Sequence, residues 1–279
     1  MQVAEPENIK MSLSTGPLQT SVNATFTMGG SDFKQTIRLE ADSKRLDFET
    51  AVEWRETHKL CRVAFPVAVR AQEATFEIQY GTVNRATHDN TKWQYAQFES
   101  CGHRYADLSD AEFGVALLND SKYGYRVKGS VLSMSLLRSP THPDPVADKG
   151  SHNFTYSILP HGRLATGDEV TTAAAILNQG LTCFNGYAAT AKSILPVAFN
   201  GDGVELAVLK KHEYSDDLVV RLVERRGNYA TGTLSISIDG ATATPCLATE
   251  AKDVGEAAAL PLTLNFKPFE IKTFRIHKN

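Results

Sequence analysis

Five aspartates between residues 107 and 148 stand in surroundings that could support acid–base chemistry. Hydrolysis of a glycosidic bond with retention needs two carboxylates about 5 Å apart, one as nucleophile and one as acid and base. Aspartate is also common in turns, because its side chain accepts hydrogen bonds from nearby backbone. We favour the turn role and predict no catalytic residue among the five. They are Asp107, Asp110, Asp120, Asp144 and Asp148.

Two groups of histidine and aspartate could hold a metal ion. A zinc site needs three or four ligands in tetrahedral geometry. Neither group has a recognised ligand spacing, and proline-rich loops hold such residues for solvation as well, so we predict no metal site. The groups are His142, Asp144, Asp148 and His152, and His88, Asp89 and His103.

The segment from Trp93 to Arg138 has the residue types that recognise sugars, which stack on aromatic faces and bond to charged and amide groups. Aromatic residues at this density are equally typical of a β-protein core, so both interpretations stay open. The aromatic candidates are Trp93, Tyr95, Tyr105, Tyr123 and Tyr125, and the polar ones Arg104, Asn119, Asp120, Lys122 and Arg138. No GxSxG, GxGxxG or phosphate-loop pattern occurs.

Arg138 ends a strand that follows the polar turn 121–129, and the alternate apolar side chains Leu132, Met134 and Leu136 are expected to face the core. Period-two alternation then places Arg138 on or beside the buried face. A guanidinium there needs a partner. We expect an ion pair with Asp120, Asp144 or Asp148, or contact with a bound sugar.

Alternation of apolar and polar residues predicts that strands dominate the chain. Residues 46–54 alternate in this way, with an apolar face inward and an acidic face outward. The runs on either side of Gly29-Gly30 predict a hairpin. Pro66 predicts a strand end, an edge or a bulge.

About a dozen strands and one convincing helix, residues 162–180, predict an all-β fold of packed antiparallel sheets. Residues 1–16 are expected to be a polar lead-in. We predict a large β-sandwich at 1–165, a linker with a short helix at 166–200, and a small β domain at 201–279.

Composition narrows the function classes. A net charge of −3 over 279 residues argues against nucleic acid as a partner. No apolar run is long enough to cross a membrane, and the start lacks the pattern of a signal peptide. The four cysteines lie far apart, so we expect reduced thiols and a cytoplasmic location.

Four segments carry a resemblance to a known family. They are RLDFETAVEWRETHKLCRVAFPV, FESCGHRYADLSDAEFGVALLNDSKYG, LLRSPTHPDPVADKGSHNFTYSILPH and KPFEIKTFRI. Together they resemble the C-terminal β region of family 38 glycoside hydrolases, most closely the cytosolic and vacuolar α-mannosidase branch. The resemblance covers nearly the whole chain.

The resemblance implies part of a large galactose-mutarotase-like sandwich, truncated at its start, followed by a smaller β-sandwich domain. In that family the zinc ion and the nucleophile lie on an N-terminal α/β barrel, which nothing in this chain resembles. We therefore expect no cofactor in this chain, and zinc in the catalytic domain.

The resemblance also implies a role for the chain: the non-catalytic C-terminal part of an enzyme that removes terminal α-linked mannose. Its partners would be the N-terminal catalytic domain and α-mannoside glycans, and association into a homo-oligomer stays open. The alternative is a stand-alone carbohydrate-binding or protein-interaction module. The LLRSP match suggests Arg138 for the sugar cleft, and the expected substrate-binding residues are Arg138, Asp120, Lys122, Tyr123, Asp144 and Asp148.

Overall fold

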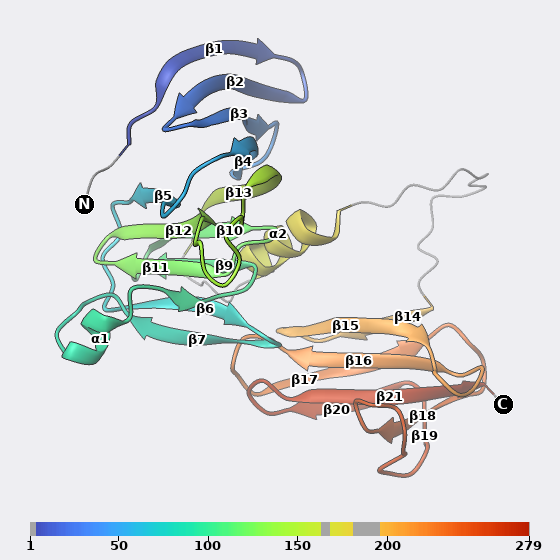
Figure 1. Ribbon diagram of the computed structural model, residues 1–279. Helices are drawn as coiled ribbons and strands as arrows, with labels where there is room; N and C mark the ends of the chain where they lie inside the picture. Colours follow the sequence, from blue (N-terminus) through green and yellow to red (C-terminus); the bar gives the residue numbers. More distant parts are fainter. Residues whose placement is uncertain (1–3, 163–167, 181–195, 279) are drawn as a thin grey trace. The chain divides into compact units, whose positions relative to one another are not determined.

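The computed structural model describes residues 4–162, 168–180 and 196–278, which belong to two compact units (Figure 1). The first unit takes in residues 1–78 and 83–181, and the second takes in 79–82 and 182–279. Within the described ranges, no helix has the length and apolar character needed to cross a membrane.

A nine-stranded sheet forms the larger layer of the first unit. Its order is β1-β2-β3-β4-β13-β10-β9-β6-β7, and the pairs from β1 to β6 along this order are antiparallel. The strands are β1 (Glu7–Thr15), β2 (Gln19–Met28), β3 (Ser31–Glu40), β4 (Leu46–Trp54), β6 (Glu73–Ile78), β7 (Gly81–Ala86), β9 (Tyr105–Ser109), β10 (Phe113–Asn119) and β13 (Gly150–Gly162).

A four-stranded antiparallel sheet, in the order β5-β12-β11-β8, packs against the nine-stranded sheet. Inward-facing residues of both sheets interdigitate in one core, among them Trp54, Phe76 and Leu117 from the large sheet and Tyr125 and Met134 from the small one. The strands are β5 (Leu60–Pro66), β8 (Ser100–Cys101), β11 (Gly124–Lys128) and β12 (Val131–Arg138).

Helix α2 (Asp168–Gln179) covers the other face of the large sheet at β9, β10 and β13. Its buried residues, Val170 and Ala174, are four positions apart and therefore lie on one side of the helix. Asp168 and Glu169 in its first turn suit the positive end of the helix dipole. The helix therefore belongs to the first unit, while residues 181–195 of the predicted linker lie outside the described residues.

The second unit is a smaller sandwich of two antiparallel sheets, in the orders β14-β17-β20 and β15-β16-β21-β18-β19. Its own core includes Leu222, Leu234 and Phe266. The strands are β14 (Val197–Asn200), β15 (Val204–Lys211), β16 (Leu218–Glu224), β17 (Ala230–Ile236), β18 (Ala241–Cys246), β19 (Ala258–Ala259), β20 (Leu262–Phe266) and β21 (Ile271–Lys278).

The all-β antiparallel architecture confirms the predicted fold class, and α2 lies within the predicted helix. The hairpin across Gly29-Gly30 is observed as β2 and β3. Pro66 ends β5, which lies at the edge of its sheet.

Three expectations are wrong. Residues 7–15 form strand β1 instead of an irregular lead-in. A second helix, α1 (Lys92–Ala96), was not predicted; Thr91 caps it and Gln94 completes the capping box. Asp47 on β4 is buried instead of outward, because it forms an ion pair with Arg45 and accepts a hydrogen bond from Ser157.

Candidate functional site

The turn between β10 and β11 carries three of the predicted substrate-binding residues and is held by a buried asparagine. Asn119 accepts hydrogen bonds from the backbone N–H groups of Ser121, at 2.8 Å, and Lys122. Its amide nitrogen donates to the carbonyl of His103 at 2.9 Å and to the hydroxyl of Tyr125. This network fixes the backbone from which the side chains of residues 120–123 project.

Lys122 is the centre of a charged cluster. Its ammonium lies 4.6 Å from the centre of the Phe154 ring, a cation–π contact. Burial lowers the pKa of Lys122, and the charges of Asp120 and Asp148 offset that effect only in part. The structure thus brings together three of the six predicted residues, although Asp148 is far from the other two in sequence.

Both carboxylates of this cluster also accept hydrogen bonds from backbone N–H groups. Asp120 Oδ2 accepts the backbone N–H of Thr155 on β13 at 2.9 Å. Asp148 Oδ2 accepts the backbone N–H of Arg138 at 3.0 Å and so joins the end of β12 to the following loop. The cluster can therefore present a fixed pattern of charge.

Arg138 is exposed, so its predicted place on or beside the buried face is wrong. The pairing of β12 with β5 shifts between Ser135 and Leu137. Leu136 and Leu137 are consequently both buried, and the next residue falls on the solvent side. Among the described residues the Arg138 side chain has no ion pair, so the predicted ion pair with an aspartate is absent there.

The two other predicted residues stand apart from Lys122. Tyr123 is 58% exposed, and its ring meets that of His103 edge-on at 5.8 Å. Asp144 is exposed, and its Oδ1 accepts the backbone N–H of Val146 at 2.9 Å in a local turn. Sugar binding by any of the six residues stays a prediction.

Asp107, a candidate acid, belongs to a buried pair with His161. Both side chains are 1% exposed, with 2.5 Å between Nε2 of the imidazole and Oδ1 of the carboxylate. Nδ1 lies 2.5 Å from the carbonyl of Gly162, so both ring nitrogens face acceptors. Burial alone would lower the pKa of His161, but the hydrogen bond and charge of Asp107 outweigh it and raise the pKa. A substrate cannot reach this pair, which is structural.

Asp110 also has a local role, as the sequence suggested. Its Oδ1 accepts the backbone N–H groups of Glu112 and Phe113, each at 3.0 Å. These bonds favour the ionised form and lower the pKa of Asp110. Across the described ranges, no group of three or more histidine, cysteine, aspartate or glutamate side chains could hold a metal ion.

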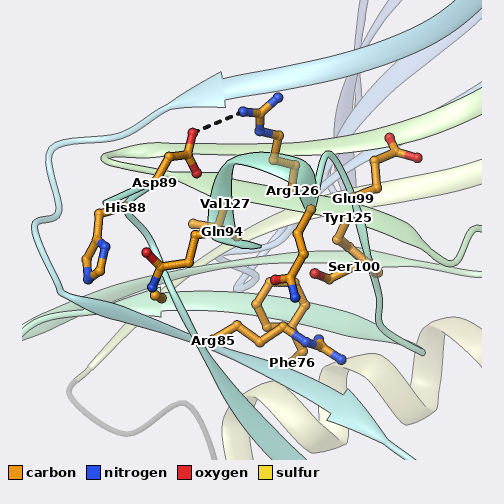
Figure 2. A pocket seen from close by; sticks show the side chains of 12 residues that line it. Phe76, Arg85, His88, Asp89, Gln94, Glu99, Ser100, Tyr125, Arg126 and Val127 are labelled. Carbon is orange, nitrogen blue, oxygen red and sulfur yellow. Dashed lines mark hydrogen bonds and ion pairs between the residues drawn. The ribbon is translucent and has the colours of Figure 1, made fainter. Parts of the chain in front are cut away.

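A polar pocket of about 260 Å³ lies among β6, β7, α1, β8 and β11 (Figure 2). Sequence reasoning did not single it out, because its lining comes from four stretches between residues 76 and 127 that only the fold brings together. Polar residues on strands, such as Arg85 and Arg126, were the available signal, since strand interiors usually hold apolar or β-branched residues.

Two family models match the chain. Residues 3–146 match the glycosyl hydrolases family 38 C-terminal domain, and residues 203–274 match the family 38 C-terminal beta sandwich domain. The first match alone covers more than half of the 279 residues.

Curated relatives are named alpha-mannosidases. Alpha-mannosidase G of Dictyostelium discoideum is 37% identical over 96% of this chain and 26% of its own length. Human alpha-mannosidase 2C1 is 40% identical over 86% of this chain and 24% of its own length. The chain thus spans about a quarter of the length of these relatives.

A solved structure has the same fold. The crystal structure of an alpha-mannosidase from Enterococcus faecalis superimposes with a TM-score of 0.78 at 15% identity, over 96% of this chain and 35% of that one. The β architecture, both family models and the relatives agree: the chain belongs to glycoside hydrolase family 38 and is its C-terminal β region.

Proposed function

We propose that this chain is the non-catalytic C-terminal part of an α-mannosidase that hydrolyses terminal α-linked mannose. The observation that carries the proposal is identity of 37–40% to named alpha-mannosidases over most of this chain but only about a quarter of theirs. In the proposal, the chain supports the catalytic part and lines its sugar cleft. Cytoplasmic location, α-mannoside glycans as substrates and a zinc ion in the catalytic part belong to the same proposal.

Surfaces of the first unit support a role as a scaffold. Every residue of β1 is exposed, including Ile9, Met11 and Leu13 on one face of the strand. Helix α1 buries no residue, and Trp93 is 83% exposed. Large exposed apolar side chains in clusters mark surfaces that another part of a protein covers.

The Lys122 cluster supports the second part of the proposal. Its aspartates are fixed by backbone hydrogen bonds, and its lysine is half-buried on an aromatic ring. Arg138 adds an exposed guanidinium at the end of the neighbouring strand. Rigid charged groups of this kind can bind hydroxyl groups of a sugar while the bond is broken by residues elsewhere.

An activity measurement tests the proposal. The 279-residue chain alone is expected not to hydrolyse an aryl α-mannoside, whereas the full-length protein is expected to do so. Turnover by the purified chain, lost on addition of a metal chelator, would overturn the proposal that this chain is non-catalytic. An inactive full-length protein would overturn the assignment to α-mannosidases.

The second candidate is a stand-alone carbohydrate-binding or protein-interaction module. It is favoured by Trp93, Tyr95 and Phe98, three aromatic side chains within six residues that are 62–83% exposed. The natural length of the protein separates the candidates. A natural protein of 279 residues that retains mannose-containing glycans would favour the module, and a protein as long as its relatives would favour the enzyme.

A further inference from the structure

The pocket of Figure 2 has a wall on which most charges are already paired. Asp89 forms ion pairs with Lys128 and, at 3.5 Å, with Arg126. Glu99 is paired with Arg62 and accepts a hydrogen bond from Ser135. Neither carboxylate therefore needs a cation from a ligand.

Arg85 is the exception. Its guanidinium carbon lies 4.5 Å from the centre of the Phe76 ring, and Figure 2 shows both on the side of the pocket away from the Asp89–Arg126 pair. Its Nη1 is shielded from solvent and has no hydrogen-bond partner. Among the described residues, no carboxylate forms an ion pair with this guanidinium. Burial lowers the pKa of Arg85, and the charge of Cys101 offsets that effect only in part.

An unmet donor of this kind is costly. A buried donor without an acceptor loses its hydrogen bond to water without replacement, and the loss is greater when the group is charged. His88 also lines the cavity, and its Nδ1, which donates or accepts according to the tautomer of the ring, is buried without a partner. Arg85 borders the cavity and is the definite donor of the two, which indicates that its guanidinium lacks an acceptor there.

The remaining lining fits a ligand that also carries hydroxyl groups. Gln94, Gln97 and Ser100 supply amide and hydroxyl groups, and the rings of Phe76 and Tyr125 supply an aromatic side. A volume of about 260 Å³ lies just below the usual range for ligand pockets, so the occupant is compact.

We propose that this pocket binds a small hydroxylated anion, whose carboxylate or phosphate group pairs with the Arg85 guanidinium. The counted charges agree with an anion. Arg85 and Arg126 line the pocket, and Lys128 and Arg62 are ion-paired with its two carboxylates, so four cationic groups stand against two anionic ones. Planar guanidinium groups bind both acid groups in a two-pronged arrangement. The site is independent of the proposed mannosidase activity.

The test is an amide NMR titration of the 279-residue chain with gluconate and with glycerol 3-phosphate, at constant ionic strength. Glycerol is the neutral control. Saturable shifts confined to residues 85–89, 94–100 and 125–127 with one anion identify its acid group, and shifts with both identify a general anion site. Absence of saturable shifts with either anion would overturn the proposal.

Two arginine variants separate this pocket from general attraction of anions. Arg85→Met removes the charge but keeps an apolar chain against Phe76, and we expect it to raise the Kd at least tenfold. Arg70→Met removes the same charge from a neighbouring hollow and is expected to leave the Kd within twofold. Equal effects of the two variants, or no effect of Arg85→Met, would refute the assignment.

A third variant covers the case in which Arg85→Met fails to fold. Gln97→Ala removes only an amide from the pocket wall, and we expect it to raise the Kd at least threefold. An unchanged Kd in this variant, without support from Arg85→Met, would count against the site.

Discussion

The imidazole of His161 faces an acceptor at each nitrogen, and this makes the first unit sensitive to pH. The folded pKa of His161 is raised above its ordinary value of 6.5. The pair with Asp107 therefore stabilises the fold fully below pH 6.5, and this contribution is lost as the pH rises through the folded pKa.

We therefore expect the wild-type first unit to lose stability between pH 6 and pH 9, and His161→Gln to lose less. Urea unfolding followed by tryptophan fluorescence measures this, because both tryptophans, Trp54 and Trp93, belong to the first unit. His142→Gln changes an exposed histidine and should keep the wild-type dependence. A wild-type slope in His161→Gln would contradict the prediction.

Because Arg138 is exposed, measurements of stability and of activity can distinguish a structural role from a role in sugar binding. A side chain on the surface without an ion pair contributes little to stability, so Arg138→Ala should change the unfolding free energy by less than about 0.5 kcal/mol. In the proposed full-length α-mannosidase we expect kcat/KM to fall roughly tenfold, or about 1.4 kcal/mol. Lys149→Ala, also exposed in the following loop, is the matched control. A lowered Tm with full activity would show a structural role instead.

At the level of elements, β1 is the least protected part of the described chain. It ends the nine-stranded sheet, so one of its edges has no neighbouring strand, and its apolar face is exposed. We expect the isolated chain to self-associate at micromolar concentration. Met11→Lys with Leu13→Lys should weaken this association, as measured by sedimentation.

The matched control places the same two charges on the other face of β1. Ser12→Lys with Ser14→Lys should reduce association less, because those positions do not carry the apolar stripe. A wild-type chain that stays monomeric over the same concentration range would exclude self-association through β1.

Strand patterns predicted most elements because alternation is local. The same signal was available for β1, where Ile9, Met11 and Leu13 alternate with polar residues. Helix α1 has five residues, too few for a helical period to emerge. Strands β20 and β21 are separate because a turn lies between them, closed by a hydrogen bond from the backbone N–H of Glu270 to the carbonyl of Lys267.

The candidate site was predictable only where it depends on neighbours in sequence. Asp120 and Lys122 share a turn, so their proximity follows from the chain itself. The burial of Arg138 was predicted wrongly because one bulge reverses every later position on a strand. Pocket residues such as Phe76 and Arg126 meet only through packing of two sheets, which no local pattern encodes.

The whole molecule has a separate core in each unit, so damage to one is expected to stay local. Glu224 in the second unit is fully buried and accepts three backbone N–H groups, from Arg226, Gly227 and Phe269, at 2.8–2.9 Å. Glu224→Gln removes the charge from this network. We expect the second unit to lose about 3 kcal/mol of stability.

Two probes of the same unfolding experiment measure this loss. Far-ultraviolet circular dichroism should show an earlier transition, while the tryptophan fluorescence midpoint should not move, since both tryptophans report on the first unit. Glu256→Gln, an exposed site in the second unit, is the control. A matching shift of the fluorescence midpoint would show that the units unfold together.

The order of strands in the large sheet also means that one strand is synthesised long before its second partner. Strand β4 pairs on one side with β3, which precedes it, and on the other with β13, where Trp54 meets Gly150 and Leu46 meets Ile158. Roughly 100 residues are made in between, which takes about 5–20 s at ribosomal rates. Throughout that interval the nascent β1–β4 meander has no permanent neighbour on its β4 edge, so the backbone groups of that edge stay open to pairing with other strands.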